Sequence, residues 1–161
     1  MNEAERIVRA YEPALRRLAA SYEANPAPRE DLVQDMLLAV WRAVPRFRSE
    51  CSERTFVYRV AQNRALSHLV HRRPPPEKLE QAAAEADPGP GPEEQAEQSQ
   101  RRSALWTALR KLPLARRQVL VLALEELPLR EIAEVLGITE NNAAVRLSRA
   151  RAALREALER P

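Results

Sequence analysis

Near the C-terminal end of the chain lie three side chains of the types that read the edges of DNA bases. Asn141 and Asn142 carry amides, which hydrogen-bond adenine edges in pairs, and Arg146 carries a guanidinium, which pairs in the same way with guanine. Arg149 follows at a spacing that suits a phosphate contact. An ordinary helical hairpin with polar residues facing solvent is the alternative interpretation.

The segment 127–151 has the pattern of a helix-turn-helix that would position these side chains. A short helix over 129–136 is expected to end at Gly137 as a left-handed C-cap, and Thr139 is expected to cap a longer helix over 140–159. The N-terminal half of such a second helix is the part that enters a major groove. Ala133 is small where the two helices must approach, and the core between them is predicted to contain Ile132, Leu136, Ile138 and Val145.

Other reactive side chains do not assemble a catalytic or metal site in the sequence. His68 and His71 lie three residues apart on an expected helix, but no third metal ligand is near, so a solvated or phosphate-facing pair is favoured. Cys51 is the single cysteine, which excludes a disulfide framework and a four-cysteine zinc site. The three glycines leave no room for a glycine-rich phosphate loop, and no nucleophile stands beside a base. We therefore expect no enzyme, no cofactor, no metal and no small-molecule substrate.

Charge divides the 161 residues into three parts. Residues 1–73 hold 13 arginines and no lysine against 9 acidic residues, and residues 101–161 hold 12 basic against 7 acidic residues. Residues 74–100 hold one lysine against 7 acidic residues, with six prolines and almost no large apolar side chain. That middle part cannot bury enough surface to offset its ordering entropy, so it predicts a flexible, acidic, proline-rich linker between two domains. Arginine suits phosphates and base edges better than lysine, although solvated basic helix faces would have the same composition.

Helical periodicity runs through both basic parts, so the predicted fold is all-α. In residues 1–73 we expect three helices, over 4–23, 29–44 and 53–72. Pro13 is expected to bend the first helix, and Glu30 and Asp31 are expected in the first turn of the second, where the helix dipole favours acidic residues.

In residues 101–161 we expect four helices. The first spans 104–112 with Ser103 as its N-cap, the second carries Pro113 in its first turn and runs to about Glu126, and the helix-turn-helix supplies the other two. No run approaches the ~20 apolar residues that span a bilayer. The charged N-terminus also lacks the apolar segment of a signal peptide, so we expect a cytoplasmic protein with no direct membrane insertion.

The whole chain resembles the extracytoplasmic-function (ECF) sigma factors, the small two-domain class of bacterial transcription initiation factors. The motifs that carry the resemblance occur in the family's order and, with the linker, cover nearly all of the chain. They are DLVQDMLLAVWRAVPRFR (31–48), RTFVYRVAQNRALSHL (54–69), LPLARRQVLVLALEELPLREIAEVLGIT (112–139) and RLSRAR (146–151). The resemblance implies sigma region 2 in residues 1–73 and sigma region 4 in residues 101–161.

In this family the helix that begins with Asp-Leu-Val-Gln binds the clamp helices of the RNA polymerase β′ subunit, and the second domain binds the β flap. The resemblance therefore places Asp31, Gln34 and Asp35 on the polymerase, with Leu32 or Met36 adding apolar contact. Acidic residues that only stabilise the helix dipole on a solvated face are the alternative.

The resemblance assigns the promoter −10 element to the loop 47–52 and the helix that follows. Trapping an unpaired base needs an aromatic or apolar wall and cations along the backbone. Tyr58 and Arg59 are neighbours and cannot share one face, while Phe56 and Val57 are favoured as core residues; Asn63 could reach a base or bond within the helix bundle. The predicted −10 set is Phe47, Arg48, Ser49, Arg54, Tyr58, Asn63 and Arg64. The loop lacks the glycine that is frequent in the family, so no base preference is transferred.

The resemblance assigns the −35 element to the helix-turn-helix. The predicted −35 set, including phosphate contacts, is Arg116, Arg130, Thr139, Glu140, Asn141, Asn142, Arg146 and Arg149. A common family motif has Gly-Thr-Val-Lys where this chain has Asn-Asn-Ala-Ala over 141–144, which removes one lysine contact. No −35 sequence is transferred either.

These residues predict a sigma factor that binds core RNA polymerase and directs promoter recognition, melting and initiation. The implied partners are core polymerase, promoter DNA and an anti-sigma factor that masks both domains and could hold the protein at a membrane. The acidic linker would thread the polymerase channel that later carries RNA. A stand-alone helix-turn-helix regulator that binds duplex DNA as a dimer is the alternative, and a helical adaptor that binds only protein is a third hypothesis.

Overall fold

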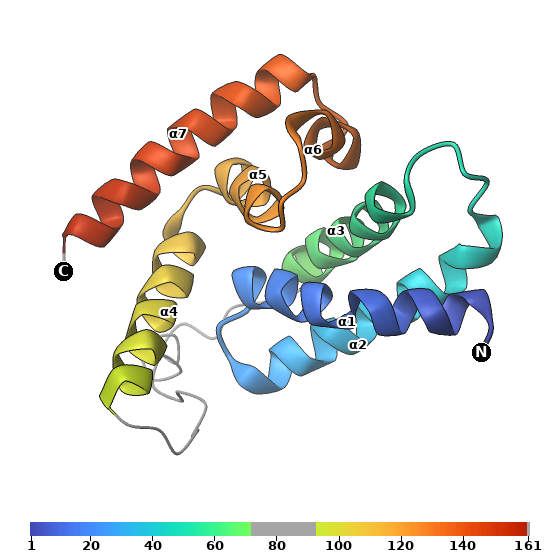
Figure 1. Ribbon diagram of the computed structural model, residues 1–161, viewed down its shortest axis with the longest axis horizontal. Helices are drawn as coiled ribbons and strands as arrows, with labels where there is room; N and C mark the ends of the chain where they lie inside the picture. Colours follow the sequence, from blue (N-terminus) through green and yellow to red (C-terminus); the bar gives the residue numbers. More distant parts are fainter. Residues whose placement is uncertain (72–92, 161) are drawn as a thin grey trace.

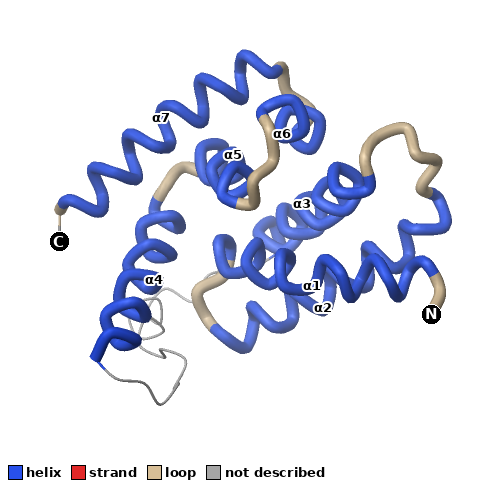
Figure 2. Tube along the Cα trace, viewed as in Figure 1, coloured by secondary structure: helices blue, strands red, loops and turns tan. Residues whose placement is uncertain are grey.

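The computed structural model describes residues 1–71 and 93–160, and within these ranges every regular element is a helix. Figures 1 and 2 show helices joined by short loops, with no strand in either described range. The all-α prediction is therefore confirmed. The elements are α1 (Glu3–Tyr22), α2 (Pro26–Ala43), the 3-10 turn η1 (Val44–Arg46), α3 (Glu53–His71), α4 (Glu93–Lys111), α5 (Leu114–Leu124), α6 (Leu129–Leu136) and α7 (Glu140–Glu159).

Helices α1 to α3, with η1, form what we call the N-terminal unit. Helix α1 starts at a capping box in which the Asn2 side chain accepts from the Glu5 amide and the Glu5 carboxylate accepts from the Asn2 amide. Pro13 lies inside this helix, as the sequence predicts. The apolar faces of the three helices meet in a core of fully buried side chains that includes Leu15, Leu18, Leu32, Met36 and Val57.

Two predicted details of α2 are wrong. The helix begins at Pro26, three residues before the expected start at Arg29, because proline is tolerated in the first turn, where its missing amide hydrogen would have no helical partner. Glu30 and Asp31 consequently lie beyond the first turn, which contains no acidic residue. The expected last residue of the third helix, Arg72, lies outside the described residues, as does most of the segment 74–100 predicted to be a linker.

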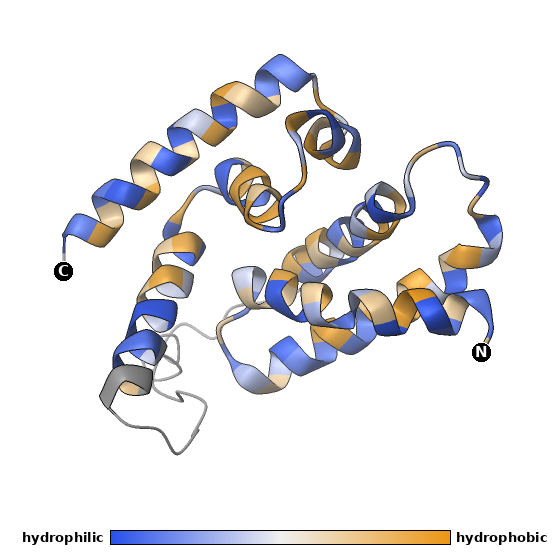
Figure 3. Ribbon diagram, viewed as in Figure 1, coloured by the Kyte–Doolittle hydropathy of each residue, from blue (hydrophilic) through white to orange (hydrophobic). Residues whose placement is uncertain are grey.

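Helices α4 to α7 form the C-terminal unit, and its first helix is longer than predicted. Helix α4 begins at Glu93, so Ser103 lies inside it and is not an N-cap. Glu, Gln and Ala dominate residues 93–100, and these are strong helix formers. Beyond its grey start, α4 is hydrophilic at first, and its apolar residues lie in its second half (Figure 3). Low hydrophobicity alone therefore suggested a linker up to residue 100.

The helix-turn-helix forms as predicted except in one core position. Gly137 has a φ of +67° as the left-handed C-cap of α6, and the Thr139 hydroxyl accepts from the Asn142 amide at 3.0 Å. Ala143 and Leu147 of α7 are buried against Ile132 of α6. Val145 is 39% exposed, so its predicted place in this core is wrong. At 100° per residue it points away from the face that carries positions 143, 147 and 150.

The two units pack against each other. Helix α3 contacts α6, and helix α1 contacts α4 and α5, so the apolar cores of the units are continuous. Figure 1 shows α6 beside the N-terminal end of α3 and α5 beside α1. This packing decides which of the predicted site residues face solvent.

Candidate nucleic-acid interface

The first half of α7 presents an open polar face. We call Glu140, Asn141, Asn142, Arg146 and Arg149 the recognition face; the first three and Arg149 are exposed, and Arg146 is half-buried. The Arg146 Nε donates to the Asn142 Oδ1 at 3.0 Å, one helical turn away. This bond holds the guanidinium beside the amide. The structure therefore brings Asn142 and Arg146 together, with Arg149 on the same side of α7, while Glu140 and Asn141 lie farther around the helix.

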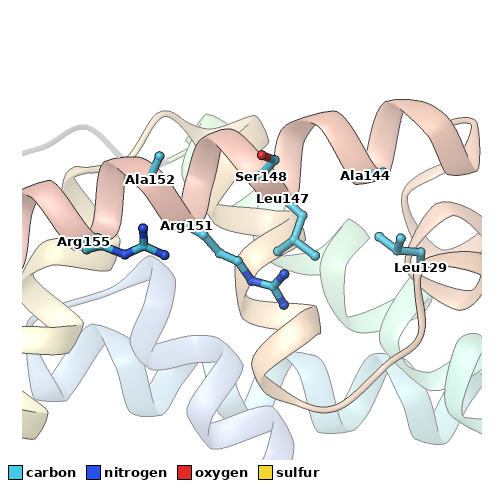
Figure 4. A pocket seen from close by; sticks show the side chains of 7 residues that line it. All are labelled: Leu129, Ala144, Leu147, Ser148, Arg151, Ala152 and Arg155. Atoms are coloured by element: carbon cyan, nitrogen blue, oxygen red, sulfur yellow. The ribbon is translucent and has the colours of Figure 1, made fainter.

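The remaining members of the predicted −35 set flank the recognition face. Arg130 is exposed on α6 and Arg116 is half-buried on α5. A pocket of about 340 Å³ opens farther along α7, and Figure 4 shows Arg151 and Leu147 extending from α7 on the side that faces Leu129 of α6. Its lining is completed by Ala144, Ser148, Ala152 and Arg155. Arg151 and Arg155 of this lining extend the positive charge of α7 beyond the recognition face.

The predicted −10 residues fall into two groups. Phe47 stacks on Phe56 with ring centroids 4.5 Å apart, and the neighbouring Arg48 and Ser49 are exposed in the loop before α3. Both rings are half-buried, so Phe56 is only partly the core residue that the sequence favours. Farther along α3, Asn63 and Arg64 are exposed.

The other two members of the predicted −10 set contact the C-terminal unit. Tyr58 is 3% exposed, its ring packs edge-on against Tyr11, and its hydroxyl donates to Glu125 Oε2 at 3.3 Å. Burial, followed by the Glu125 carboxylate, raises the pKa of the Tyr58 hydroxyl above its ordinary value. Arg54 donates through Nε to Glu131 Oε2 at 2.8 Å. Tyr58 is therefore buried, whereas the Arg54 side chain is 38% exposed while it pairs with Glu131. DNA contact by either residue stays a prediction.

Helix α2 carries the residues predicted to bind polymerase, and one part of that prediction is wrong. Leu32 and Met36 are completely buried, because they lie on the face that packs into the N-terminal core. They therefore cannot add apolar contact to a partner. Asp31 and Gln34 are exposed, and the half-exposed Asp35 lies 3.7 Å from the Arg64 guanidinium.

The exposed apolar side chains on α2 are Leu38 and Trp41, which the sequence reasoning missed. Leu38 is 46% exposed and Trp41 is 40% exposed. Positions 31, 34, 38 and 41 share one face of a helix, and we call Asp31, Gln34, Leu38 and Trp41 the α2 stripe. The helical spacing of these four positions from Asp31 was the signal in the sequence that could have found the stripe.

The histidines and the remaining acidic residues form no larger cluster. His68 Nε2 lies 3.5 Å from Glu23 Oε2 in a nearly buried pair. Across residues 1–71 and 93–160, no group of three or more His, Cys, Asp or Glu side chains is placed to hold a metal ion. Within the same ranges, no helix combines the length and apolarity needed to cross a membrane.

The fold and its exposed residues define a class: a two-unit helical protein that carries a helix-turn-helix. Comparisons with known proteins specify the class further. The family model for sigma-70 region 2 matches residues 7–74, and the model for sigma-70 region 4 matches residues 102–154. These two matches fall on the N-terminal unit and the C-terminal unit.

Characterised relatives agree with the family models. The RNA polymerase sigma factor CnrH of Cupriavidus metallidurans is 30% identical over 155 residues, which cover 91% of this chain and 81% of the relative. The probable RNA polymerase sigma factor RfaY of Xanthomonas campestris pv. campestris is 30% identical over 158 residues. That alignment covers 95% of this chain but 40% of the relative, so the chain spans less than half of that protein's length.

Two solved structures share the arrangement of helices. CnrH, in complex with the cytosolic domain of CnrY, superposes with a TM-score of 0.70 at 25% identity, covering 97% of this chain and 87% of that chain. RpoE from Bartonella quintana, in complex with the anti-sigma factor NepR, gives 0.74 at 21% identity with 99% of both chains covered, which shows the fold alone. The chain belongs to the sigma-70 family of RNA polymerase sigma factors, and it is of the two-domain ECF type.

Proposed function

We propose that this ECF sigma factor directs transcription initiation through three separate surfaces of its own chain. The α2 stripe binds the β′ clamp of core RNA polymerase, the 47–52 loop with α3 holds the −10 element, and the recognition face of α7 reads the −35 element. The observation that carries the proposal is the α2 stripe, because a stand-alone helix-turn-helix regulator needs no second exposed surface of this kind.

The composition of the α2 stripe suits a basic, partly apolar partner. The Asp31 carboxylate gives charge complementarity with a basic coiled coil, which speeds encounter and fixes the register. Leu38 and Trp41 present exposed apolar area, and buried tryptophans are frequent among the residues that dominate binding energy. Asp35, held beside Arg64, adds a second carboxylate at the edge of the stripe.

The two DNA surfaces divide the work of promoter recognition. In the duplex −35 element, Asn141, Asn142 and Arg146 contact base edges in the major groove while neighbouring arginines contact phosphates. At the −10 element, the stacked pair of Phe47 and Phe56 supplies an aromatic wall for an unpaired base, with Arg48 beside the backbone. The chemistry of RNA synthesis stays with the polymerase, so the chain itself acts as a binding protein and not as an enzyme.

An anti-sigma factor is the inferred regulator. RpoE has been solved with the anti-sigma factor NepR, and CnrH has been solved with the cytosolic domain of CnrY. By this likeness a protein inhibitor would hold the present chain inactive in the cytoplasm until a signal releases it. A linker over residues 74–92 and the domain boundary at 73 remain sequence predictions, because residues 93–100 belong to α4.

The experiment is a fluorescence-anisotropy titration of the full chain with core RNA polymerase in the absence of DNA. We expect saturable binding that Asp31→Arg and Trp41→Ala each weaken at least tenfold with unchanged helicity. Glu159→Arg, an exposed charge reversal on α7, is the matched control and should bind like the unchanged chain. A folded, monodisperse chain that does not bind polymerase contradicts the proposal, and selection of duplex DNA with the chain alone would then test the regulator hypothesis.

A further inference from the structure

The N-terminal and C-terminal units are joined by ion pairs between residues that are far apart in the sequence. The Arg17 guanidinium on α1 donates to both carboxylate oxygens of Glu125, at 2.6 and 2.8 Å. The same carboxylate accepts from the Tyr58 hydroxyl of α3. Glu125 follows α5 directly, and its side chain is only 11% exposed. One acidic residue of the C-terminal unit thus holds two helices of the N-terminal unit.

A second acidic residue holds the start of α3. Arg54 donates to Glu131 through Nε at 2.8 Å, with Nη2 at 2.7 Å from the same oxygen, and the Glu131 side chain is 15% exposed. One turn farther along α3, Arg59 Nη2 donates to the Glu134 backbone carbonyl at 3.0 Å. Helix α6 therefore covers the side of α3 that carries Arg54 and Tyr58.

Two arginines of the C-terminal unit contact the C-terminal end of α1. We call these contacts between the two units, together with those of Glu125 and Glu131, the junction. Helix α1 has no basic residue in its last turn, where unpaired carbonyls and the helix dipole favour a cation. Arg110 of α4 donates to the Ala20 carbonyl at 2.8 Å, and Arg117 of α5 donates to the Ser21 carbonyl at 3.4 Å. Burial lowers the pKa of both guanidiniums, which marks them as partly desolvated at the junction.

Two of these contacts engage Arg54 and Tyr58, which belong to the predicted −10 set. The Glu125 and Glu131 side chains are nearly buried, whereas Arg17 and Arg54 keep 52% and 38% of their side-chain surface exposed. Loss of an arginine would leave a nearly buried carboxylate without that partner, which favours the packed arrangement. The Asn141 and Asn142 side chains of the recognition face remain exposed in the same arrangement. The junction therefore engages two residues of the predicted −10 set and leaves the recognition face open, while Arg48, Ser49, Asn63 and Arg64 stay exposed.

We propose that the free chain has a closed conformation in which Glu125 and Glu131 of the C-terminal unit hydrogen-bond Tyr58 and Arg54. In this conformation the C-terminal unit competes with the −10 DNA strand for these two side chains of α3. Promoter engagement then requires the units to separate, and any partner that binds separated units shifts the equilibrium. The competition rests on the proposed function and on the −10 role that the sequence predicts for Arg54 and Tyr58, whereas the closed conformation by itself does not.

The closed conformation is tested first in the full chain without polymerase or DNA. Donor and acceptor dyes are attached to Ala10→Cys on α1 and Ala157→Cys on α7 in a Cys51→Ser background, and single-molecule energy transfer is measured. We expect one narrow distribution, which broadens in Glu125→Arg/Glu131→Arg. The control Glu126→Arg/Glu134→Arg makes the same change of net charge with two exposed side chains and should leave the distribution narrow. A broad distribution in the unchanged chain, or identical distributions in both variants, overturns the proposal.

The competition is tested with a fluorescent single-stranded DNA oligonucleotide of mixed sequence. A chain that is closed nine-tenths of the time binds about tenfold more weakly than its open form. Glu125→Arg/Glu131→Arg should therefore bind at least about tenfold more tightly than the control of equal net charge. Equal binding by the two variants overturns the competition. If the tighter binding persists after Arg54→Ala is added to the open variant, the −10 role of Arg54 fails while the closed conformation stands.

Discussion

The recognition face of α7 and the Arg54–Tyr58 side of α3 have similar chemistry but different availability. Asn141 and Asn142 are exposed, whereas Arg54 and Tyr58 are bound by two glutamates of the C-terminal unit. The recognition face is organised by bonds within one helix turn, from Thr139 to Asn142 and from Asn142 to Arg146. Bonds within α7 organise the recognition face in any arrangement of the units. Arg54 and Tyr58, in contrast, are bound by the two glutamates only when the units pack together.

The largest effect is expected from a substitution in the core under the recognition face. Ile132→Ala deletes a fully buried side chain between α6 and α7 and should lower the free energy of unfolding by about 2–5 kcal/mol. The −35 surface should be lost with it, while the N-terminal unit retains its own core. Thermal unfolding followed by circular dichroism measures the change. Val145→Ala is the control and should cost less than about 0.5 kcal/mol, because Val145 faces solvent.

The next effect concerns the junction and appears at alkaline pH. Burial raises the pKa of Tyr22 to about 12, while Gln118 of α5 and Gln62 of α3 hydrogen-bond its hydroxyl. The folded chain thus keeps this proton at pH values where the unfolded chain, with a pKa near 10, has lost it. The resulting stability is complete below about pH 10 and decreases by about 2–3 kcal/mol as the pH rises to about 12.

Tyr22→Phe should remove this part of the alkaline destabilisation. The measurement is chemical denaturation of the unchanged chain and of the variant between pH 9 and pH 12. The quantity compared is the slope of the free energy of unfolding against pH in each chain. Comparison of the two chains cancels the titration of the other tyrosines. Parallel pH profiles would show that the Tyr22 hydroxyl does not retain its proton in the fold.

A smaller effect tests how the recognition face reads DNA. Arg146→Ala should weaken promoter binding by about 1–3 kcal/mol if the guanidinium contacts a base. The loss should be concentrated on promoters that carry the preferred −35 base, measured with holoenzyme on a panel of −35 variants. An equal loss on every variant would identify Arg146 as a phosphate contact instead.

The smallest effect removes the cap of the recognition helix. Thr139→Ala takes away the acceptor of the Asn142 amide and should lower stability by about 1 kcal/mol. Thr139→Ser retains the hydroxyl and should restore most of that stability. Equal melting temperatures for the alanine and serine variants would show that the cap contributes nothing measurable.

Much of the C-terminal unit was predictable because its signals are local. Gly137 and Thr139 specify a left-handed C-cap and an N-cap through bonds that span a few residues, and both occur as expected. The start of α4 was missed because low hydrophobicity suggested a linker where helix propensity prevailed. The first turn of α2 was missed because prolines usually interrupt helices, although the first turn of a helix accepts them.

The sequence by itself determined the helices, the helix-turn-helix and the membership of the sigma-70 family, because each depends on spacing within a short stretch. Only the tertiary structure decided which side chains are free. Leu32 turned inward while Leu38 and Trp41 turned outward, since helix packing selects one face of α2. Glu125 binds Tyr58 across 67 residues and Arg17 across 108 residues, separations over which no local pattern carries information. Such contacts arise from the packing of whole units, so the pairing of Tyr58 and Arg54 with the C-terminal unit could not be predicted from the local sequence around these residues.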